Sequence, residues 1–309
     1  MNRPDSAQQT RDPSKKLLWP AFATLYVVWG STYLAIKYAV QTIPPYLMAG
    51  GRFLVSGIIL FAWARFRGSP APTRREWRDS AIVGVLLLCA GNGAVGWAEQ
   101  KVPSGLTALL VASVPIWMIL LDWLRPHGKR PPGVVVAGLV IGLAGVGVLA
   151  LPEPGTLAPV NPSGALMLLF GSVMWAAGSI YSRQGARPES AEMATGIQMI
   201  TGSVALLLVA LVTGEFTDFH PGSVTAASFA GWAYLVTFGA LLGFTAYVYL
   251  LRETSPAKAS TYAYVNPVVA VVLGWAIAGE PITTRTLSGA VVIVASVALV
   301  TLTGGSQGN

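Results

Sequence analysis

Hydrophobic residues gather into ten stretches along the chain, and short polar connections separate them. A helix needs ~20 mainly apolar residues to cross a bilayer, and these stretches have about that length. The predicted spans cover residues 17–40, 45–66, 80–99, 103–124, 133–151, 163–183, 190–213, 227–250, 256–278 and 286–303. The pattern therefore predicts an all-α integral membrane protein with ten transmembrane helices.

The second group of five spans repeats features of the first. Trp29 begins a Trp-Gly-Ser motif with Lys37 eight residues further on, and Trp175 begins a Trp-Ala-Ala-Gly-Ser motif with Arg183 at the same distance. Because each group has an odd number of spans, the second enters the membrane in the opposite orientation. Inverted repeats of this kind build secondary transporters, whose substrate site lies near the membrane midplane between the repeats. We expect two inverted five-helix repeats around a central cavity, at 17–152 and 153–303.

Composition and charge agree with a membrane location. Hydrophobic residues make up 53% of the 309 residues and charged residues only 11%, against the ~25% charged of a soluble domain. Lys and Arg accumulate in alternate connections, whereas the opposite connections hold only Lys101 and Arg285. By the positive-inside rule, both termini are predicted to be cytoplasmic in an inner (plasma) membrane protein, with a disordered tail at 1–16 and a short tail at 304–309. Topology and anionic lipid account for the net charge of +7, so no nucleic-acid partner is expected.

Residues that carry most enzyme and metal chemistry are scarce. Cys89 is the single cysteine, which excludes an intramolecular disulfide, and His127 and His220 are predicted to lie in loops on opposite sides of the membrane. The sequence contains neither a zinc-binding HExxH motif nor a phosphate-binding GxxxxGK[ST] loop. We therefore expect no enzyme activity, no cofactor and no metal. A membrane-embedded enzyme would need a reactive cluster at one interface, and the short loops offer none.

Several short motifs carry a resemblance to a known family. They are Trp29-Gly30-Ser31-Thr32-Tyr33, Ser113-Val114-Pro115, Tyr264-Val265-Asn266-Pro267 and Gly279-Glu280. With the five-plus-five repeat, over roughly residues 20–302, the chain resembles the EamA family of the drug/metabolite transporter (DMT) superfamily, and within it the bacterial YddG/YedA-like exporters. The resemblance implies a basket-like fold of ten helices around a central cavity. It also implies export of small metabolites, with amino acids as the leading class.

Polar and aromatic residues that share helix faces are the candidates for the substrate pathway. In the first span Tyr26, Trp29, Tyr33 and Lys37 fall on one helical stripe, which an inward face lining a polar cavity explains. The alternative is that Tyr26 and Lys37 anchor the helix at the interfaces and Trp29 packs in the core. The predicted cavity residues are Trp29, Tyr33, Asn92, Trp175, Ser179, Tyr247, Tyr262 and Asn266.

Three charges lie inside predicted helices. Lys37 is near the outer end of its helix, where it either faces the pathway or snorkels to the interface. Arg52 lies about two turns into its helix, where an unpaired charge is costly, so it needs a partner. It either forms a structural clamp with Glu99 or a backbone carbonyl, or attracts a substrate carboxylate. Glu99 is predicted near the outer end of the third helix.

Two prolines are expected to bend helices that frame the site. Pro115 and Pro267 remove the backbone donors that would pair with the carbonyls of Val111 and Ala263. A freed carbonyl in a membrane is tolerated where it lines a cavity or finds another donor. Because the disruption recurs at matching places in both repeats, we expect these helices to surround the substrate.

Aromatic walls with few charges favour a large neutral or aromatic amino acid, carried with broad specificity by alternating access. No carboxylate or histidine is predicted at mid-depth, which favours facilitated export over proton coupling. The alternative is an exporter of drugs, lipophilic cations or other metabolites coupled to protons. Expected partners are a small-molecule substrate and membrane lipid. The apolar helices 133–151 and 286–303 are assigned to scaffold or dimer contact, so the protein is a monomer or homodimer.

Overall fold

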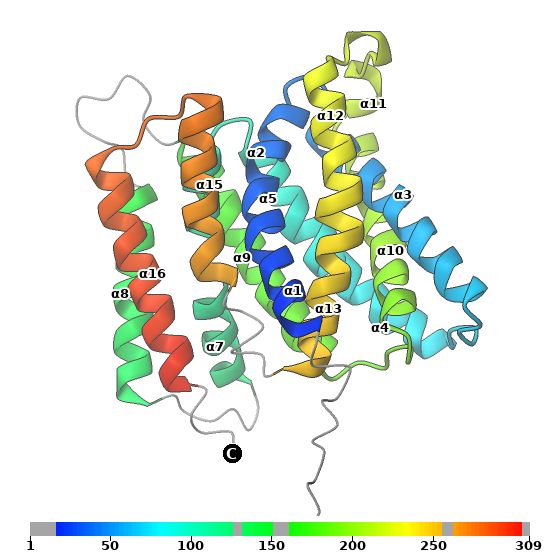
Figure 1. Cartoon of the computed structure of the whole chain (residues 1–309), viewed down its shortest axis with the longest axis horizontal. Helices are drawn as coiled ribbons and strands as arrows, with labels where there is room; N and C mark the ends of the chain where they lie inside the picture. The colour runs from blue at the N-terminus through cyan, green and yellow to red at the C-terminus, as the bar shows by residue number, and fades with distance from the viewer. Residues whose placement is uncertain (1–16, 126–131, 151–160, 255–261, 305–309) are drawn as a thin grey trace, which may run out of the picture.

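The computed structural model describes residues 17–125, 132–150, 161–254 and 262–304, which fold into helices without a strand among them (Figure 1). The predicted tail 1–16, most of the predicted tail 304–309 and the first residues of the predicted span 256–278 lie outside the described residues. The helices of the first half are α1 (Leu18–Thr24), the π-helix η2 (Leu25–Trp29), α2 (Gly30–Ala39), α3 (Pro45–Phe66), α4 (Arg74–Gly84), the π-helix η3 (Val85–Asn92), α5 (Gly93–Ala98), α6 (Ser104–Val111), α7 (Val114–Leu124) and α8 (Gly133–Ala150). Those of the second half are α9 (Pro162–Ser182), α10 (Ala191–Val212), α11 (Glu215–Asp218), the 3-10 helix η4 (Pro221–Ser223), α12 (Ala226–Tyr234), the π-helix η5 (Leu235–Leu242), α13 (Gly243–Glu253), α15 (Tyr262–Ala278) and α16 (Thr284–Gly304).

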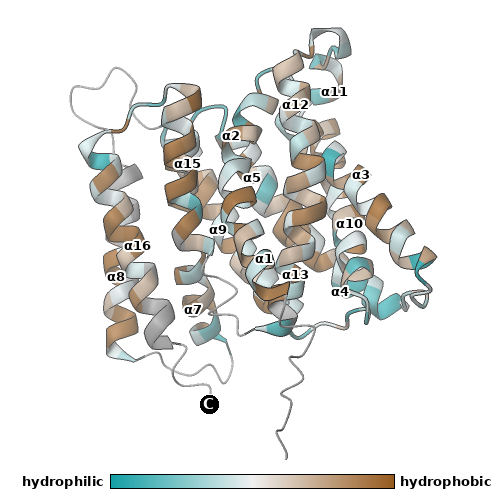
Figure 2. Cartoon of the chain, viewed as in Figure 1, coloured by the Kyte–Doolittle hydropathy of each residue, from teal (hydrophilic) through white to brown (hydrophobic). Residues whose placement is uncertain are grey.

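Every predicted span is helical over most of its described residues, which confirms the all-α prediction. Within the described part of the chain, six helical segments are long and apolar enough to cross a membrane: Pro45–Phe66, Arg74–Ala98, Ser104–Leu124, Pro162–Ser182, Ala191–Val212 and Ala226–Leu250. Shorter apolar helices follow at Gly133–Gly142, Val265–Ala278 and Thr284–Ser296. Brown, apolar residues predominate along most of these helices (Figure 2). These helices indicate a multi-pass membrane protein.

Two helices differ from the sequence prediction for identifiable reasons. The third predicted span starts near residue 80, whereas α4 already begins at Arg74, because Thr73 and Glu76 form a capping box that stabilises a polar first turn. The fourth predicted span is divided into α6 and α7, with Pro115 in the first turn of α7. The bend expected at Pro115 is thus a break between two helices, while Pro267 lies inside the continuous helix α15.

Helix α10 packs closely against both α3 and α4. Gly84 of α4 and Gly202 of α10 meet so closely that a Cβ added to Gly202 would lie 2.7 Å from the carbonyl oxygen of Gly84. Small residues let membrane helices approach until their backbones touch, and van der Waals contact then replaces the hydrophobic effect that lipid cannot supply. This packing joins the two halves of the chain through helices of both.

Helices α8 and α16 run side by side at one edge of the molecule (Figure 1). The hydroxyl of Ser296 on α16 donates to the carbonyl of Gly138 on α8 at 2.6 Å. A Cβ at Gly142 would lie 2.4 Å from the Ser296 hydroxyl oxygen, so the absence of a side chain there permits the contact. The outward faces of both helices are apolar, with Val140 63% and Val291 68% exposed. The pair therefore forms an apolar edge beside the rest of the fold.

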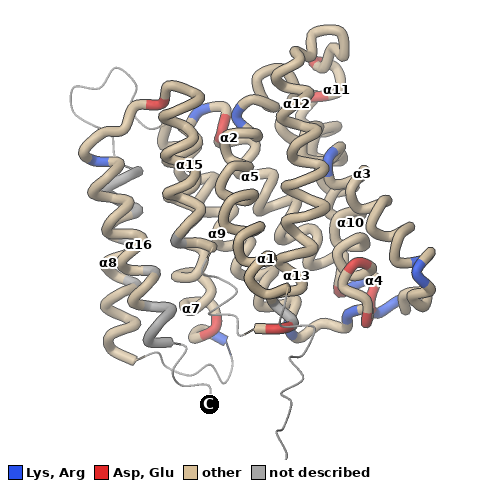
Figure 3. The backbone as a smooth tube through the Cα atoms, viewed as in Figure 1, with Lys and Arg blue, Asp and Glu red and all other residues tan. Residues whose placement is uncertain are grey.

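Charged residues lie mainly towards the ends of the helices (Figure 3). Two glutamates of the second half occupy the N-termini of helices in the first half. Glu215 accepts hydrogen bonds from the backbone N–H groups of Tyr46 and Leu47 in α3, at 3.3 and 2.8 Å. Glu280 accepts bonds from the first residues of α6. The first N–H groups of a helix lack partners within it and carry partial positive charge, so a carboxylate there stabilises the helix.

Candidate functional site

Three π-helical segments widen the helices in the centre of the molecule. They are η2, η3 and η5, and each continues directly into an α-helix that starts with a glycine. A π-turn adds a residue to the turn, which changes the direction of the side chains that follow and occurs frequently at functional sites. The segments η3 and η5 have the same length and precede Gly93 and Gly243 at corresponding places in the two halves.

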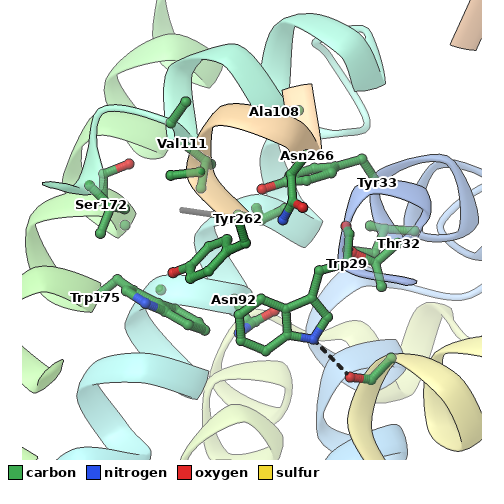
Figure 4. Close-up of a pocket in the computed structure, with 18 of the residues that line it drawn as sticks. Trp29, Thr32, Tyr33, Asn92, Ala108, Val111, Ser172, Trp175, Tyr262 and Asn266 are labelled. Carbon is green, nitrogen blue, oxygen red and sulfur yellow. Dashed lines mark hydrogen bonds between the residues drawn. The ribbon is translucent and has the colours of Figure 1, made fainter. Parts of the chain in front are cut away.

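A cavity lies where these segments meet α15, α6 and α9 (Figure 4). Residues from eleven of the helices form its wall. The lining residues are Trp29, Thr32, Tyr33, Ile36, Arg52, Phe53, Gly91, Asn92, Val95, Ala108, Val111, Ala112, Val114, Gly171, Ser172, Trp175, Gly239, Phe244, Tyr262, Ala263, Asn266 and Pro267. The wall is mostly aromatic and aliphatic with a small number of polar groups, which is the usual composition of a small-molecule site.

Trp29 is the centre of the aromatic part of the wall. Its ring centroid lies 5.2 Å from that of Phe244, 5.1 Å from Tyr262 and 6.0 Å from Trp175. Tyr262 and Trp175 meet the indole edge-on, the arrangement in which aromatic pairs attract beyond their buried area. Tyr247 packs against Trp29 on a further side at 5.0 Å. One indole therefore holds aromatic side chains from α9, α13 and α15 in place.

The indole itself is fixed by the backbone of η5. Its N–H donates to the carbonyl of Gly239 at 3.2 Å, shown by the dashed line in Figure 4. A Cβ at Gly243 would lie 2.3 Å from the indole nitrogen of Trp29, so only glycine leaves room for the ring. Trp29 and the Gly239–Gly243 segment consequently form one unit that joins the first half of the chain to the second.

The two asparagines of the wall are held by different partners. In the orientation that satisfies its amide, the nitrogen of Asn266 donates to the carbonyls of Tyr262 and Leu25, both at 3.2 Å. Asn266 thus joins α15 to the π-segment η2. The side-chain oxygen of Asn92 accepts a hydrogen bond from Arg52 at 2.9 Å. The clamp between Arg52 and Glu99 that the sequence allowed does not form, because Asn92 takes the guanidinium instead.

The structure brings together six of the eight predicted cavity residues: Trp29, Tyr33, Asn92, Trp175, Tyr262 and Asn266. It places Ser179 and Tyr247 in a second cavity, which Asp79, Gln198 and Arg187 also line. Phe244 lines both cavities and so forms part of the partition between them.

The sequence prediction did not include Phe244, Ser172 or Thr32, which also line the first cavity. Helical periodicity could have found Phe244, since it lies three residues before Tyr247 and shares its helix face.

The predicted intramembrane charges have three different environments. Arg52 is a cavity residue and only 3% exposed. Glu99 is 5% exposed, and neither carboxylate oxygen has a hydrogen-bond partner in the described part of the chain. Lys37 forms an ion pair with Glu280 at 2.5 Å. Burial works to raise the pKa of Glu280, but hydrogen bonds from Lys37 and from the backbone of Ser104 and Gly105 outweigh it and hold the pKa below its usual value.

Comparison with known proteins decides the family. The model of the EamA-like transporter family matches the chain twice, at residues 18–151 and 162–302. The protein belongs to the EamA-like transporter family. The two matches coincide with the two halves of the fold and account for nearly all the described helices. The resemblance seen in the sequence motifs is thereby confirmed.

Relatives across bacteria carry the names of transporters. The chain is 41% identical over 286 residues to the inner membrane transporter YedA of Escherichia coli K12, covering 92% of this chain and 90% of that protein. It is 28% identical to the transporter YvbV of Bacillus subtilis, covering 90% of this chain and 89% of the relative. A solved crystal structure with 20% identity superposes with a TM-score of 0.65 over 93% of this chain and 98% of that chain, which shows a shared fold. This EamA protein is therefore a multi-pass membrane transporter.

Proposed function

We propose that this EamA protein exports large neutral and aromatic amino acids from the cytoplasm by alternating access. The observation that carries the proposal is the cavity centred on Trp29, which combines the rings of Trp29, Trp175, Tyr262 and Phe244 with a few polar groups. Aromatic faces suit a bulky apolar side chain. The polar groups suit the α-amino and α-carboxylate groups of an amino acid, because a small-molecule site uses a few directed hydrogen bonds to fix the orientation of its ligand.

The inverted repeat is part of the proposal. Matching π-segments η3 and η5 support it, as do the two family matches to successive halves. In a ten-span protein with both termini cytoplasmic, the Lys37–Glu280 pair lies at the outer end and the cavity containing Asp79 and Arg187 lies towards the cytoplasm. In alternating access, the outer end, which the Lys37–Glu280 pair holds closed, and the cytoplasmic end, which Phe244 separates from the first cavity, then open in turn.

A lipophilic cation is the weaker candidate substrate. A cation carrier needs a carboxylate at its site, whereas the ionisable residue in the wall of the first cavity that bears full charge is Arg52. Glu99, the nearby acid, is not among the cavity-lining residues. The electrostatics of the wall thus favour a ligand that brings negative charge.

We propose that export is facilitated, driven by the substrate gradient alone. Proton coupling is the second candidate, because Glu99 is buried without a hydrogen-bond partner in the described part of the chain. A carboxyl group in such a place is suited to bind and release a proton as its surroundings change. The two candidates differ in whether a pH gradient drives substrate accumulation.

The testing experiment is uptake of labelled amino acids into proteoliposomes of the purified protein, with and without a pH gradient. Uptake of phenylalanine, tryptophan and leucine is expected, with a large loss in Trp29→Ala and Asn266→Ala. Leu166→Ala, which truncates a side chain 67% exposed on the outside of α9, is the matched control for insertion and folding. Absence of amino-acid uptake by correctly folded protein would overturn the proposal.

A further inference from the structure

Arg52 is a buried cation in the wall of the cavity. Its side chain is 3% exposed, and its guanidinium carbon lies 4.4 Å from the centroid of the neighbouring Phe53 ring. One terminal nitrogen donates to the oxygen of Asn92 at 2.9 Å. The Nε atom is buried and has no hydrogen-bond partner among the described residues. A guanidinium has five N–H donors, so this environment leaves donor capacity unused.

The buried charge also has no carboxylate in contact. The ion pairs of Lys37 with Glu280, Arg78 with Asp79 and Arg125 with Asp122 do not involve Arg52. Glu99 is within electrostatic range of Arg52 but forms no ion pair with it. Removing a cation from water costs several kcal/mol unless an anion with good geometry repays it. A fixed cation facing a cavity without its anion is therefore a site for an anionic group of a ligand.

We propose that Arg52 binds the carboxylate of the transported molecule and is the residue that determines specificity for it. The planar guanidinium can donate two parallel hydrogen bonds to a carboxylate, a geometry that ammonium groups and amides lack. Asn92 holds the guanidinium in position, and Phe53 covers one of its faces. The aromatic group around Trp29 then takes the other end of the ligand. This inference rests on the proposed function for the choice of amino acids, but the anchor itself requires only a carboxylate.

Three ligands that share a phenyl ring separate the contributions of their charges. L-Phenylalanine has both charges, 3-phenylpropionate has only the carboxylate, and phenethylamine has only the amine. Binding is measured for the purified full-length protein by the quenching of tryptophan fluorescence and by competition against labelled phenylalanine in proteoliposomes. A hydrogen-bonded charge contact worth about 1.5–3 kcal/mol predicts about ten- to hundredfold weaker binding of phenethylamine than of phenylalanine.

Arg52→Gln is expected to reduce this preference to about threefold or less, because it removes the cation and leaves the rings around Trp29 in place. Folding is checked by gel filtration and thermal unfolding. The second variant is Asn92→Asp, which places a carboxylate at the position of the atom 2.9 Å from the guanidinium. It supplies Arg52 with an internal anion, so it should raise the unfolding temperature while abolishing the preference for the ligand carboxylate. Simple loss of an Asn92 contact would instead weaken all three ligands equally.

Each outcome decides between the inference and the proposed function. Binding of 3-phenylpropionate with Arg52-dependent affinity, but no binding of phenylalanine, would keep the anchor and overturn amino-acid export. Binding of phenylalanine with an unchanged preference in folded Arg52→Gln and Asn92→Asp would overturn the anchor alone. Preference of the wild type for phenethylamine, or binding of none of the three ligands, would overturn both.

Discussion

Lys37 and Glu280 form an ion pair of 2.5 Å across the two family domains of the chain. The Glu280 carboxylate also accepts from the backbone N–H and hydroxyl of Ser104, both at 2.9 Å, and from the N–H of Gly105 at 3.2 Å. One carboxylate therefore neutralises a lysine of α2 and caps the N-terminus of α6. Since it sits in the turn between α15 and α16, it ties four helices together at one end of the molecule.

Replacing Glu280 is expected to destabilise the protein more than replacing Lys37. Glu280→Gln removes the ion pair and the charge at the helix terminus, and should lower the free energy of unfolding by about 2–3 kcal/mol. Lys37→Met leaves the helix cap in place and should cost less. Thermal unfolding of the purified variants in one detergent measures the difference. Asp122→Asn, which removes an exposed pair with Arg125, is the control and should change stability by less than about 1 kcal/mol.

The same carboxylate should make stability depend on acid pH. Hydrogen bonds from Lys37, Ser104 and Gly105 outweigh burial and hold the pKa of Glu280 below its usual 4.5. A lowered pKa in the folded state gives stabilisation that is complete above pH 4.5 and is lost as the pH falls through the lowered value. The wild-type unfolding temperature should fall over this acid range more steeply than that of Glu280→Gln. Parallel curves for the two proteins would contradict the assigned role.

Glu215 should make stability depend on pH in the opposite direction. Burial raises its pKa above 4.5, although the N–H groups of Leu47 and Tyr46 work in the other direction. Because burial of the charge outweighs the two backbone hydrogen bonds, ionisation of Glu215 lowers the stability of the fold. The stabilisation is complete below pH 4.5, where the carboxyl group is protonated, and is lost as the pH rises through the raised pKa. Glu215→Gln should flatten the stability curve on that side only. If this variant lost stability only at acid pH, the assigned effect of Glu215 ionisation on the start of α3 would be wrong.

Gly243 should be intolerant of the smallest side chain. A methyl group there would lie 2.3 Å from the indole nitrogen of Trp29, and would force the ring away from the carbonyl of Gly239. Gly243→Ala is expected to cost about 1–3 kcal/mol and to reduce substrate uptake strongly. Gly133→Ala is the control, since the added carbon would meet no described atom within 4 Å other than those of its chain neighbours and its own helix backbone. Equal uptake by the two variants would argue against the fixed position of Trp29.

Glu99→Gln tests the source of energy. If export is facilitated, the variant should accumulate no less amino acid than the wild type under any pH gradient. Uptake into proteoliposomes at several internal and external pH values, compared with exchange at equal pH, makes the measurement. Gradient-driven accumulation that disappears in Glu99→Gln while exchange continues would replace facilitation by proton coupling.

Most helices could be predicted from the sequence because membrane-spanning helices are long apolar stretches. The prediction failed where a helix begins with polar residues or is interrupted. The first turns of α4 depend on the cap formed by Thr73 and Glu76, which a search for apolar stretches overlooks. The break between α6 and α7 was visible as Pro115, but the form of the break depends on tertiary packing.

The site was harder to predict because helical periodicity assumes a constant turn. Each π-segment adds a residue and moves the following side chains to a different face, so the stripe extended through η3 or η5 drifts from the true cavity face. Tyr247 and Ser179 were predicted to line the same cavity as Trp29. Tyr247 does pack against Trp29, but both residues line the second cavity. The pairing of Lys37 with Glu280 joins residues far apart in the sequence, and no local pattern contains it.

The hydrogen bond from Trp29 to Gly239 has a consequence for how such a cavity can diversify. Its acceptor is a carbonyl in a widened turn, and the space for the indole comes from a missing side chain at Gly243. The main chain therefore sets the outline of the chamber. Side chains such as Thr32, Val111 and Ser172 only line it. Exchanging them alters which substrate fits without changing the backbone that forms the cavity.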